Sequence, residues 1–393
     1  MSAKKIATRL AHLGNHPHEH QGVINPPVYH ASTIAHKNLD DLKTRRKSGA
    51  RAVTYGRDGT PTTFAFEDTV TDLEGGFGSI TVSSGLAAIH LSLMSLLKPG
   101  DHILIADTVY APVRNLCNNV LTPLNIICEF YDPTIGASIE SLLRKNTRVV
   151  YMESPGSHTF EIIDVPAITN AVSDRDIVTV FDNTWATPLF FKPLSHGVDI
   201  VIHAVTKYLG GHSDLMMGVV VCNEQTFSQV RRYCSLIGQS VAPDDIYLAQ
   251  RGIRTLKARL DVHQENALRL TDFLMEQPET IRVIHPALED HPGHTIFKRD
   301  FSGSSGLFGV VIQPVDDIAL AAMLDSLELF FMGFSWGGYE SLIIPYDINQ
   351  HRSVTPLKDN GVLLRIHAGL EDSGDLIDDL TSGFKRLRAA RLT

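Results

Sequence analysis

Lys207 has the most chemically informative surroundings of any residue in this chain. It follows an apolar run, Ile200 to Val205, and a threonine, and it precedes an aromatic residue and two glycines. Such a run predicts a buried strand that delivers one amine to its carboxyl end, with a flexible turn beyond. Loss of hydration lowers the pKa of a buried lysine and makes the free amine available as a nucleophile. The alternative is a strand-end lysine whose amine reaches solvent.

Asp182 ends a second apolar run, Ile177 to Phe181, 25 residues before Lys207. Neighbouring strands of an open α/β sheet present their carboxyl ends at one edge, and ligands bind along that edge. Pyridoxal 5'-phosphate needs both groups, since its aldehyde bonds a lysine and its ring nitrogen takes an acid. Taken alone, Asp182 is more typical of a turn residue after a strand. The pairing with Lys207 favours the cofactor.

A third segment predicts a phosphate site. The short run Ile80 to Val82 is followed by Ser83, Ser84 and Gly85, and then by a helical pattern. A glycine lets the backbone approach an anion closely, and a helix N-terminus offers free N–H groups and a positive dipole. The serines are equally typical of a plain helix N-cap. Thr206 adds a hydroxyl next to Lys207.

Several motifs resemble one known family. They occur in the family's order along nearly the whole chain, from about Thr8 to the final helix: Tyr55-Gly-Arg57, Leu73-Glu-Gly-Gly76, Ser83-Ser-Gly85, Asp107-Thr-Val-Tyr110, Glu153-Ser-Pro155, Asp182-Asn-Thr-Trp185, Thr206-Lys-Tyr-Leu-Gly-Gly-His-Ser213 and Leu364-Arg-Ile366. The chain is similar to the cystathionine and methionine metabolism family of pyridoxal-phosphate enzymes, the γ-family of the aspartate-aminotransferase fold type. Two further segments most resemble bacterial cystathionine β-lyases: Gly303-Ser-Ser-Gly-Leu-Phe308 and Ser335-Trp-Gly-Gly-Tyr-Glu-Ser341.

The resemblance implies roles in binding the cofactor. Lys207 would bond the aldehyde, and Asp182 would partner the ring nitrogen. Tyr110 would stack on the ring and help accept a proton from the substrate amine. The phosphate would be held by residues of two subunits: Gly85, Leu86 and Thr206 from one, and Tyr55 and Arg57 from its neighbour.

The resemblance also implies a substrate pocket. Arg365 would clamp the substrate's α-carboxylate in a bidentate pair, and Ser335 and Trp336 would line the pocket. The γ-acting relatives usually have leucine in place of Trp336. Two positions depart from the wider family: Ala204 replaces a serine that touches phosphate, and Ser157 replaces an asparagine that bonds the cofactor's phenolic oxygen. Bacterial β-lyases share both departures.

The predicted fold class is α/β, aspartate-aminotransferase-like (fold type I). We expect an N-terminal arm (residues 1–58), a pyridoxal-phosphate-binding domain with a mainly parallel sheet (59–250) and a smaller α/β domain (251–393). Apolar runs predict the strands, which alternate with helical segments in the large domain: Ile103–Ala106, Ile126–Phe130, Val149–Met152, Val178–Phe181, Ile200–Val205, Val219–Cys222, Leu307–Ile312, Leu342–Ile344 and Val362–Ile366. Three stretches read as helical: Leu248–Met275, which bridges the domains, Ile318–Leu329 and Asp375–Leu387.

The expected reaction is β-elimination on a sulfur amino acid. Lys207, freed by the incoming substrate amine, would remove the Cα proton while the ring held by Asp182 takes up the charge, and the Cβ–S bond would break. With L-cystathionine the products are homocysteine, pyruvate and ammonia, a transsulfuration step of methionine biosynthesis. The alternatives on this scaffold are cystathionine γ-synthase, γ-lyase and a broad cysteine-S-conjugate β-lyase. A regulatory protein that retains the fold is the non-enzyme alternative, and the presence of both Lys207 and Asp182 argues against it.

Composition narrows the expected partners. A formal net charge of -9 argues against a nucleic-acid surface. The most apolar stretch, Leu86 to Leu97, is too short to span a bilayer. We expect a cytoplasmic protein, since the N-terminus shows no apolar signal core and the cysteines show no C-x-x-C spacing. No metal is expected, because the histidines lack zinc-site spacing. The expected partners are a small sulfur amino acid and identical subunits, in a homotetramer whose active sites are shared between subunits.

Overall fold

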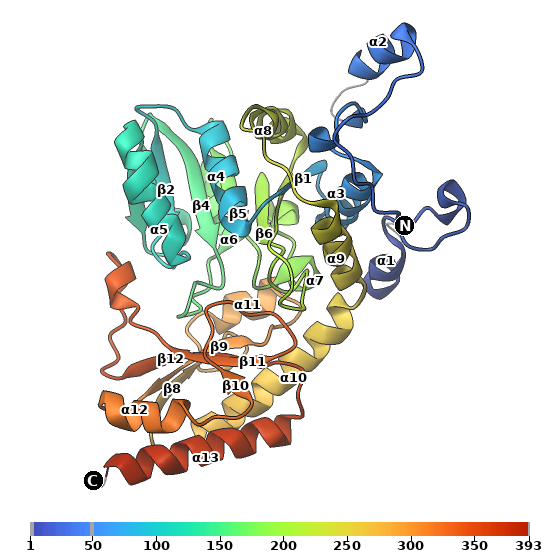
Figure 1. The fold of residues 1–393 in the computed structure, drawn as a ribbon. Coiled ribbons are helices and arrows are strands. Elements are labelled where there is room, and N and C mark those ends of the chain that lie inside the picture. Colours follow the sequence, from blue (N-terminus) through green and yellow to red (C-terminus); the bar gives the residue numbers. More distant parts are fainter. Residues whose placement is uncertain (1–3, 48–50, 392–393) are drawn as a thin grey trace.

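The computed structural model describes residues 4–47 and 51–391. These residues form a seven-stranded and a five-stranded sheet, both packed against helices (Figure 1). The larger sheet comes from the first part of the chain and the smaller one from the C-terminal part. This is the α/β architecture expected of an aspartate-aminotransferase-like fold. The domain boundaries at residues 58 and 250 stay predictions, and residues 1–3 and 48–50 of the expected arm lie outside the described residues.

The larger sheet has the strand order β1-β7-β6-β5-β4-β2-β3. Neighbours from β6 to β3 are parallel, whereas β7 runs antiparallel to both β6 and β1, so the sheet is mainly parallel as predicted. Its strands are β1 (Gly78–Val82), β2 (His102–Ala106), β3 (Ile127–Tyr131), β4 (Thr147–Glu153), β5 (Val178–Asp182), β6 (Ile200–Ala204) and β7 (Gly218–Cys222). Helices on both faces bury the central strands, which explains their nearly continuous apolar sequences.

The helices around this sheet begin and end at recognisable signals. Ser84 caps α4 by accepting a hydrogen bond from the Ala87 N–H, and Gly75 ends α3 with a left-handed φ of 77°. The helices are α3 (Pro61–Glu74), α4 (Gly85–Leu96), α5 (Ala111–Leu116), α6 (Val165–Val172), α7 (Thr187–Phe190) and α8 (Glu224–Leu236). Because α4 begins directly after β1, its N-terminus lies at one end of the sheet.

The smaller sheet has the order β10-β11-β12-β9-β8. Only the short β10–β11 contact is parallel. The strands are β8 (Thr280–Ile284), β9 (Leu307–Ile312), β10 (Phe330–Phe331), β11 (Ser341–Pro345) and β12 (Val362–His367), and the helices that follow in this part are α11 (His294–Asp300), α12 (Asp317–Leu324) and α13 (Ser373–Arg391). Figure 1 shows α13 lying along the lower side of this sheet.

The stretch predicted as one long bridging helix is two helices, α9 (Pro243–Arg254) and α10 (Leu256–Met275). The break lies at Thr255, where the Gly252 carbonyl accepts from the Thr255 N–H at 3.1 Å and from Arg259 Nη2 at 2.8 Å. These bonds replace the regular i→i+4 bond at that carbonyl. The amphipathic pattern continues across the break, so periodicity alone does not reveal it.

The N-terminal segment contains α1 (Ile6–His12), the 3₁₀ turn η1 (Pro17–His20) and α2 (Leu39–Lys47), although little helical periodicity was expected there. α1 packs against the rest of the same chain: Leu10 is buried, and its carbonyl accepts from Arg254 Nη1 at 2.7 Å. α2 instead projects away from the body of the molecule (Figure 1). Among the described residues, no helix is both long enough and apolar enough to cross a membrane.

Candidate active site

The structure places Lys207 and Asp182 at the same edge of the larger sheet. β5 ends at Asp182 and runs parallel to β6, and the turn after β6 carries Lys207. Both side chains line one cavity, which is also bordered by the start of α4 and by loops of the smaller sheet. The empty volume of this cavity, out to its open mouth, is about 1190 Å³. One site therefore contains both the acid and the amine.

The amine of Lys207 is partly buried and directed into the cavity. Its Nζ donates to Ser335 Oγ at 2.7 Å and lies 5.3 Å from the centre of the Trp336 ring. Burial lowers the pKa of Lys207, the charge of Arg365 lowers it further, and Asp182 opposes both, which leaves the pKa at about 8. At pH 7 roughly a tenth of the amine is therefore uncharged, far more than for an ordinary lysine, and the uncharged form is the one that a nucleophile or general base requires.

The carboxyl group of Asp182 is desolvated by burial. Its Oδ1 accepts from the Thr184 N–H at 2.9 Å. Burial raises the pKa of Asp182 above its ordinary value, although hydrogen bonds from Thr184 and the nearby His203 and Lys207 act in the opposite direction. A cation placed against this carboxyl group would favour its ionised form. The site thus has a place for a positively charged group beside Asp182.

Glu153 is a second carboxyl group at this edge, and sequence reasoning included it only as part of a family motif. It ends β4 in register with Asp182 on β5, and it lines the same cavity. Its Oε2 accepts from the Tyr110 N–H at 2.8 Å. Burial, followed by the neighbouring Asp182, raises the pKa of Glu153 well above its ordinary value. In the sequence Glu153 follows an apolar run, just as Asp182 does. The same pattern therefore predicts a carboxyl group at this edge of the sheet for both residues.

The start of α4 forms another part of the cavity wall. Gly85 and Leu86 line it, and the first turn of any α-helix leaves backbone N–H groups without helical partners. A Cβ on Gly85 would lie 2.6 Å from the Cβ of Ala204, so only glycine lets the helix approach β6 this closely. Thr206 lines the same cavity, and its hydroxyl accepts from the Met217 N–H at 3.0 Å. Backbone donors and a positive helix end together suit an anion.

Tyr110 and Arg365 approach the cavity from different sheets. Tyr110 is the N-cap residue of α5, and its ring is about half exposed. Arg365 lies on β12 and is 5% exposed. Its guanidinium donates to the carbonyls of Phe334 at 2.8 Å and Gly333 at 2.6 Å, whereas its Nε has no partner among the described residues. Its Nη2 also donates to the Ser335 carbonyl at 3.0 Å. Burial lowers the pKa of Arg365 to about 10, so it stays a cation at neutral pH.

Tyr55 and Arg57 lie outside this cavity. They border a separate cleft, next to the short turn η3 (Gly56–Asp58) and the segment before α9. The Arg57 guanidinium stacks 5.1 Å from the centre of the Tyr55 ring, and its Nε lies 3.7 Å from Asp58 Oδ1. Within one subunit, neither residue is part of the site that contains Lys207.

Comparison with known proteins assigns this arrangement to a family. Residues 7–385 match the Cys/Met metabolism PLP-dependent enzyme family. The chain belongs to this family. Its members use pyridoxal 5'-phosphate (PLP), and so does this chain.

Individual relatives cover nearly the whole chain. Cystathionine beta-lyase MetC of Escherichia coli (strain K12) is 41% identical over 394 residues, 98% of this chain and 100% of its own length. Cystathionine beta-lyase of Haemophilus influenzae is 41% identical over 392 residues, 97% and 98% of the two chains. The crystal structure of cystathionine gamma synthase from Xanthomonas oryzae pv. oryzae in complex with cystathionine superposes with a TM-score of 0.89 at 30% identity, covering 98% and 99%.

The cavity fits the cofactor of this family at two places. The buried carboxyl group of Asp182, whose pKa is raised by desolvation, suits a protonated ring nitrogen, and the α4 N-terminus at Gly85 suits a phosphate. Lys207 lines the cavity with a partly deprotonated amine, as a bond to the aldehyde requires. Ala204 and Ser157 also line the cavity, so both departures from the wider family pattern lie where a cofactor would contact them.

Proposed function

We propose that this chain is a carbon–sulfur β-lyase that cleaves L-cystathionine to homocysteine, pyruvate and ammonia. The observation that carries the proposal is the meeting of Lys207, Asp182 and Arg365 around one cavity in a chain of this family. The relatives from E. coli and H. influenzae, both about two-fifths identical over nearly their full lengths, are cystathionine β-lyases. Trp336, at a position where γ-acting relatives usually have leucine, also favours β-cleavage.

The cofactor supplies an electron sink that stabilises negative charge at the substrate's Cα. The remaining steps fall to residues of this chain. Asp182 holds a proton on the ring nitrogen, because an ionised carboxylate favours the charged form of its partner. Lys207, once released by the substrate amine, takes the proton from Cα, and a pKa of about 8 suits this transfer near neutral pH. The same amine then donates its proton to the departing sulfur, and water hydrolyses the remaining three-carbon fragment to pyruvate and ammonia.

Substrate binding is assigned to the wall formed by the smaller sheet. Arg365 lines the cavity and supplies a fixed positive charge for the α-carboxylate. Ser335 accepts from the Lys207 amine, so its hydroxyl keeps that amine directed into the cavity. Trp336 packs beside the amine, with its ring centre 5.3 Å from Lys207 Nζ. Tyr110, which lines the cavity, would stack on the ring of the bound cofactor and would help to take a proton from the incoming substrate amine.

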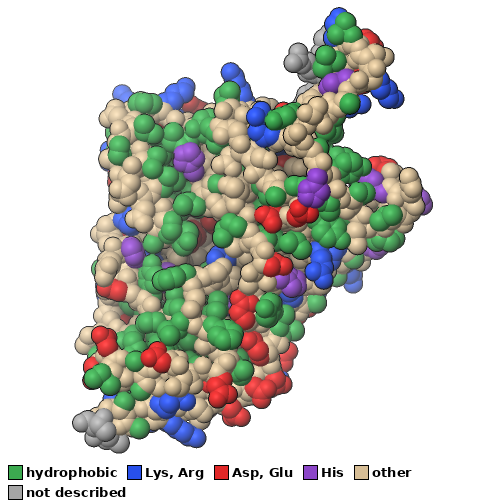
Figure 2. Space-filling model, in the orientation of Figure 1, with side chains coloured by type: hydrophobic (Ala, Val, Ile, Leu, Met, Phe, Trp, Pro, Cys, Tyr) green, Lys and Arg blue, Asp and Glu red, His purple; other side chains and the backbone are tan. Residues whose placement is uncertain are grey.

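The active enzyme is proposed to be an oligomer, a homotetramer in which Tyr55 and Arg57 of one subunit complete the phosphate site of another. In their own subunit both residues lie outside the cavity. The loop between β10 and β11 exposes large apolar side chains, among them Phe334 at 84%. Figure 2 shows hydrophobic side chains gathered on this face, over the smaller sheet. Exposed apolar groups of this kind mark protein interfaces.

The four cysteines are free thiols, which fits the reducing cytoplasm.

Product identification tests the function. Purified protein loaded with PLP is incubated with L-cystathionine, and the keto acid and thiol are identified. Pyruvate with homocysteine supports β-cleavage, whereas 2-oxobutyrate with cysteine assigns γ-lyase activity instead. Condensation of an activated homoserine ester with cysteine assigns γ-synthase activity. If the protein turns over no sulfur amino acid and Lys207→Ala still binds a regulatory partner normally, the non-enzyme alternative holds.

A further inference from the structure

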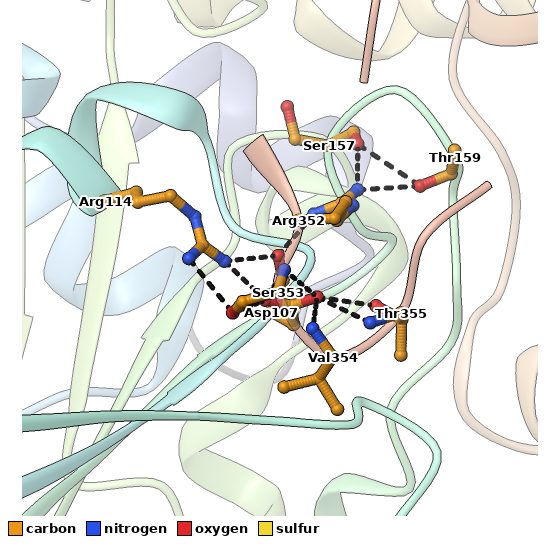
Figure 3. Close-up of polar contacts among 8 residues, drawn as sticks. All are labelled: Asp107, Arg114, Ser157, Thr159, Arg352, Ser353, Val354 and Thr355. Atoms are coloured by element: carbon orange, nitrogen blue, oxygen red, sulfur yellow. Dashed lines mark hydrogen bonds and ion pairs between the residues drawn. The ribbon is translucent and has the colours of Figure 1, made fainter. Parts of the chain in front are cut away.

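A long connection in the smaller sheet crosses back onto the larger sheet. It joins β11 to β12 and comprises residues 346–361, called the strap below. Ile348 is buried near its start, but Ser353, Val354 and Pro356 in its middle are exposed. Apolar burial therefore contributes little to holding the middle of the strap. Polar contacts hold it instead (Figure 3).

Asp107 is the centre of these contacts. It follows β2 directly and is completely buried. Consecutive backbone N–H groups of the strap donate to its carboxylate: Ser353 at 3.1 Å, Val354 at 2.9 Å and Thr355 at 2.7 Å. The Ser353 and Thr355 hydroxyls and Arg114 also donate to it (Figure 3). Burial would raise the pKa of Asp107, but these backbone donors outweigh it and hold the pKa far below its ordinary value.

Arg352 extends the contact to a second loop of the larger sheet. Its Nη1 donates to the Asp107 carbonyl at 2.5 Å, and its Nη2 donates to the Ser157 carbonyl and to Thr159 Oγ1, both at 2.8 Å. The Ser157 N–H in turn donates to the Thr108 carbonyl at 2.7 Å. The strap is thus fastened to the loop after β2 and to the loop after β4 at once. These contacts are called the Asp107–Arg352 clamp below.

The segments joined by the clamp carry the walls of the active site. The loop after β2 leads from Asp107 to Tyr110, and the loop after β4 contributes Ser157 and His158 to the cavity. The strap itself continues into β12, which carries Arg365. At its other end Tyr346 stacks on His158, with ring centres 3.5 Å apart. The clamp therefore ties the strand of the proposed carboxylate-binding arginine to the loop of the proposed ring-stacking tyrosine.

We infer that Asp107 and Arg352 are positioning residues for the substrate's α-carboxylate. By holding the strap against the larger sheet, they set where Arg365 stands relative to Tyr110 and Lys207. If the strap is released from Asp107, β12 and its Arg365 can move away from the cofactor. The amino acid substrate then binds more weakly. The chemical step changes less, because Lys207 and Asp182 both belong to the larger sheet. This inference rests on the proposed function for its substrate, and on the geometry for the clamp.

The test uses the PLP-loaded protein and the variants Arg352→Gln and Asp107→Asn. Arg352→Gln removes the clamp's charged donors without altering the buried carboxylate, so it serves even where Asp107→Asn folds poorly. The matched control is Arg388→Gln, which removes a pair of 2.8 Å bonds to Glu279 away from the strap. The measurements are kcat and KM with L-cystathionine, the Kd of L-alanine from the absorption of bound PLP, and trypsin cleavage after the exposed Lys358.

In Arg352→Gln we expect KM and the Kd of L-alanine to rise about tenfold, the effect of one or two lost charge-assisted bonds. We expect kcat to stay within about threefold, cleavage after Lys358 to be faster, and the control to behave like the native protein. Unchanged KM and Kd in both clamp variants, together with faster cleavage, would overturn the inference. If the native protein releases no pyruvate from cystathionine, the proposed function fails, yet the L-alanine titration still decides the role of the clamp.

Discussion

Replacing Asp182 with asparagine tests the electrostatic core of the proposed site. The two side chains have nearly the same shape, and the Thr184 N–H that donates to Oδ1 at 2.9 Å can donate equally to an amide oxygen. What is lost is the negative charge beside the ring nitrogen. A charge-assisted hydrogen bond is worth about 1.5–3 kcal/mol. Since about 1.4 kcal/mol corresponds to a tenfold change in rate, kcat should fall roughly ten- to a hundredfold, and further if the ring also loses its proton.

The assay measures kcat with L-cystathionine at saturating PLP, together with the cofactor's absorption and content. The matched control is Asp199→Asn, at the opposite end of β6. Asp199 also accepts several bonds there, from the Thr179 N–H at 2.8 Å and from Asn223 Nδ2 at 2.7 Å. The control should lose stability while kcat is preserved. Full activity of Asp182→Asn with a normal cofactor content would refute the assignment of Asp182 to the ring nitrogen.

Three further predictions concern other parts of the site. Arg365→Leu should raise KM for amino acid substrates about ten- to a hundredfold, the range expected for a lost charged contact. The absorption band of bound PLP should stay intact. Loss of this band would contradict a role of Arg365 in binding the substrate's carboxylate. The kcat should decline as the pH falls below about 8, because Lys207 must be uncharged to accept the Cα proton and its pKa is about 8; a pH-independent kcat between 6 and 9 speaks against Lys207 as the base. Dilution to monomers should release PLP, measured by ultrafiltration, because Tyr55 and Arg57 lie outside their own cavity; monomers that retain full cofactor exclude the shared site.

The strands of the larger sheet could be predicted from the sequence because the central ones are short apolar runs bounded by polar residues. Each predicted run of the larger sheet corresponds to a strand in the structure, with ends that differ by a residue or two. Val205 was placed in a strand but belongs to the following turn, where the Lys207 N–H bonds the Ala204 carbonyl at 3.0 Å. β8 was not predicted, since Arg282 interrupts its apolar sequence. The end of β6 is set by this turn hydrogen bond and β8 by its pairing with β9, and a pattern of apolar residues shows neither.

The site could be predicted where a residue's chemistry shows in its own segment. Lys207 and Asp182 each end an apolar run, and this places both at one edge of a parallel sheet. The clamp has no such local signal, because Asp107 and Ser353 are 246 residues apart. Whether a carboxylate after a strand faces a ligand or fastens a loop depends on the donors that reach it. Those donors come from a connection whose path the sequence does not specify.

The charges around the cavity also indicate that binding of the substrate makes Lys207 a stronger base. In the ligand-free protein the cation Arg365 lowers the pKa of Lys207, so the amine is a weaker base than burial alone would leave it. A substrate carboxylate on Arg365 cancels that charge, and the pKa of Lys207 then rises. The base thus becomes stronger when there is a Cα proton to remove. It follows that the acidic limb of kcat should lie at higher pH for substrates with an α-carboxylate than for analogues without one.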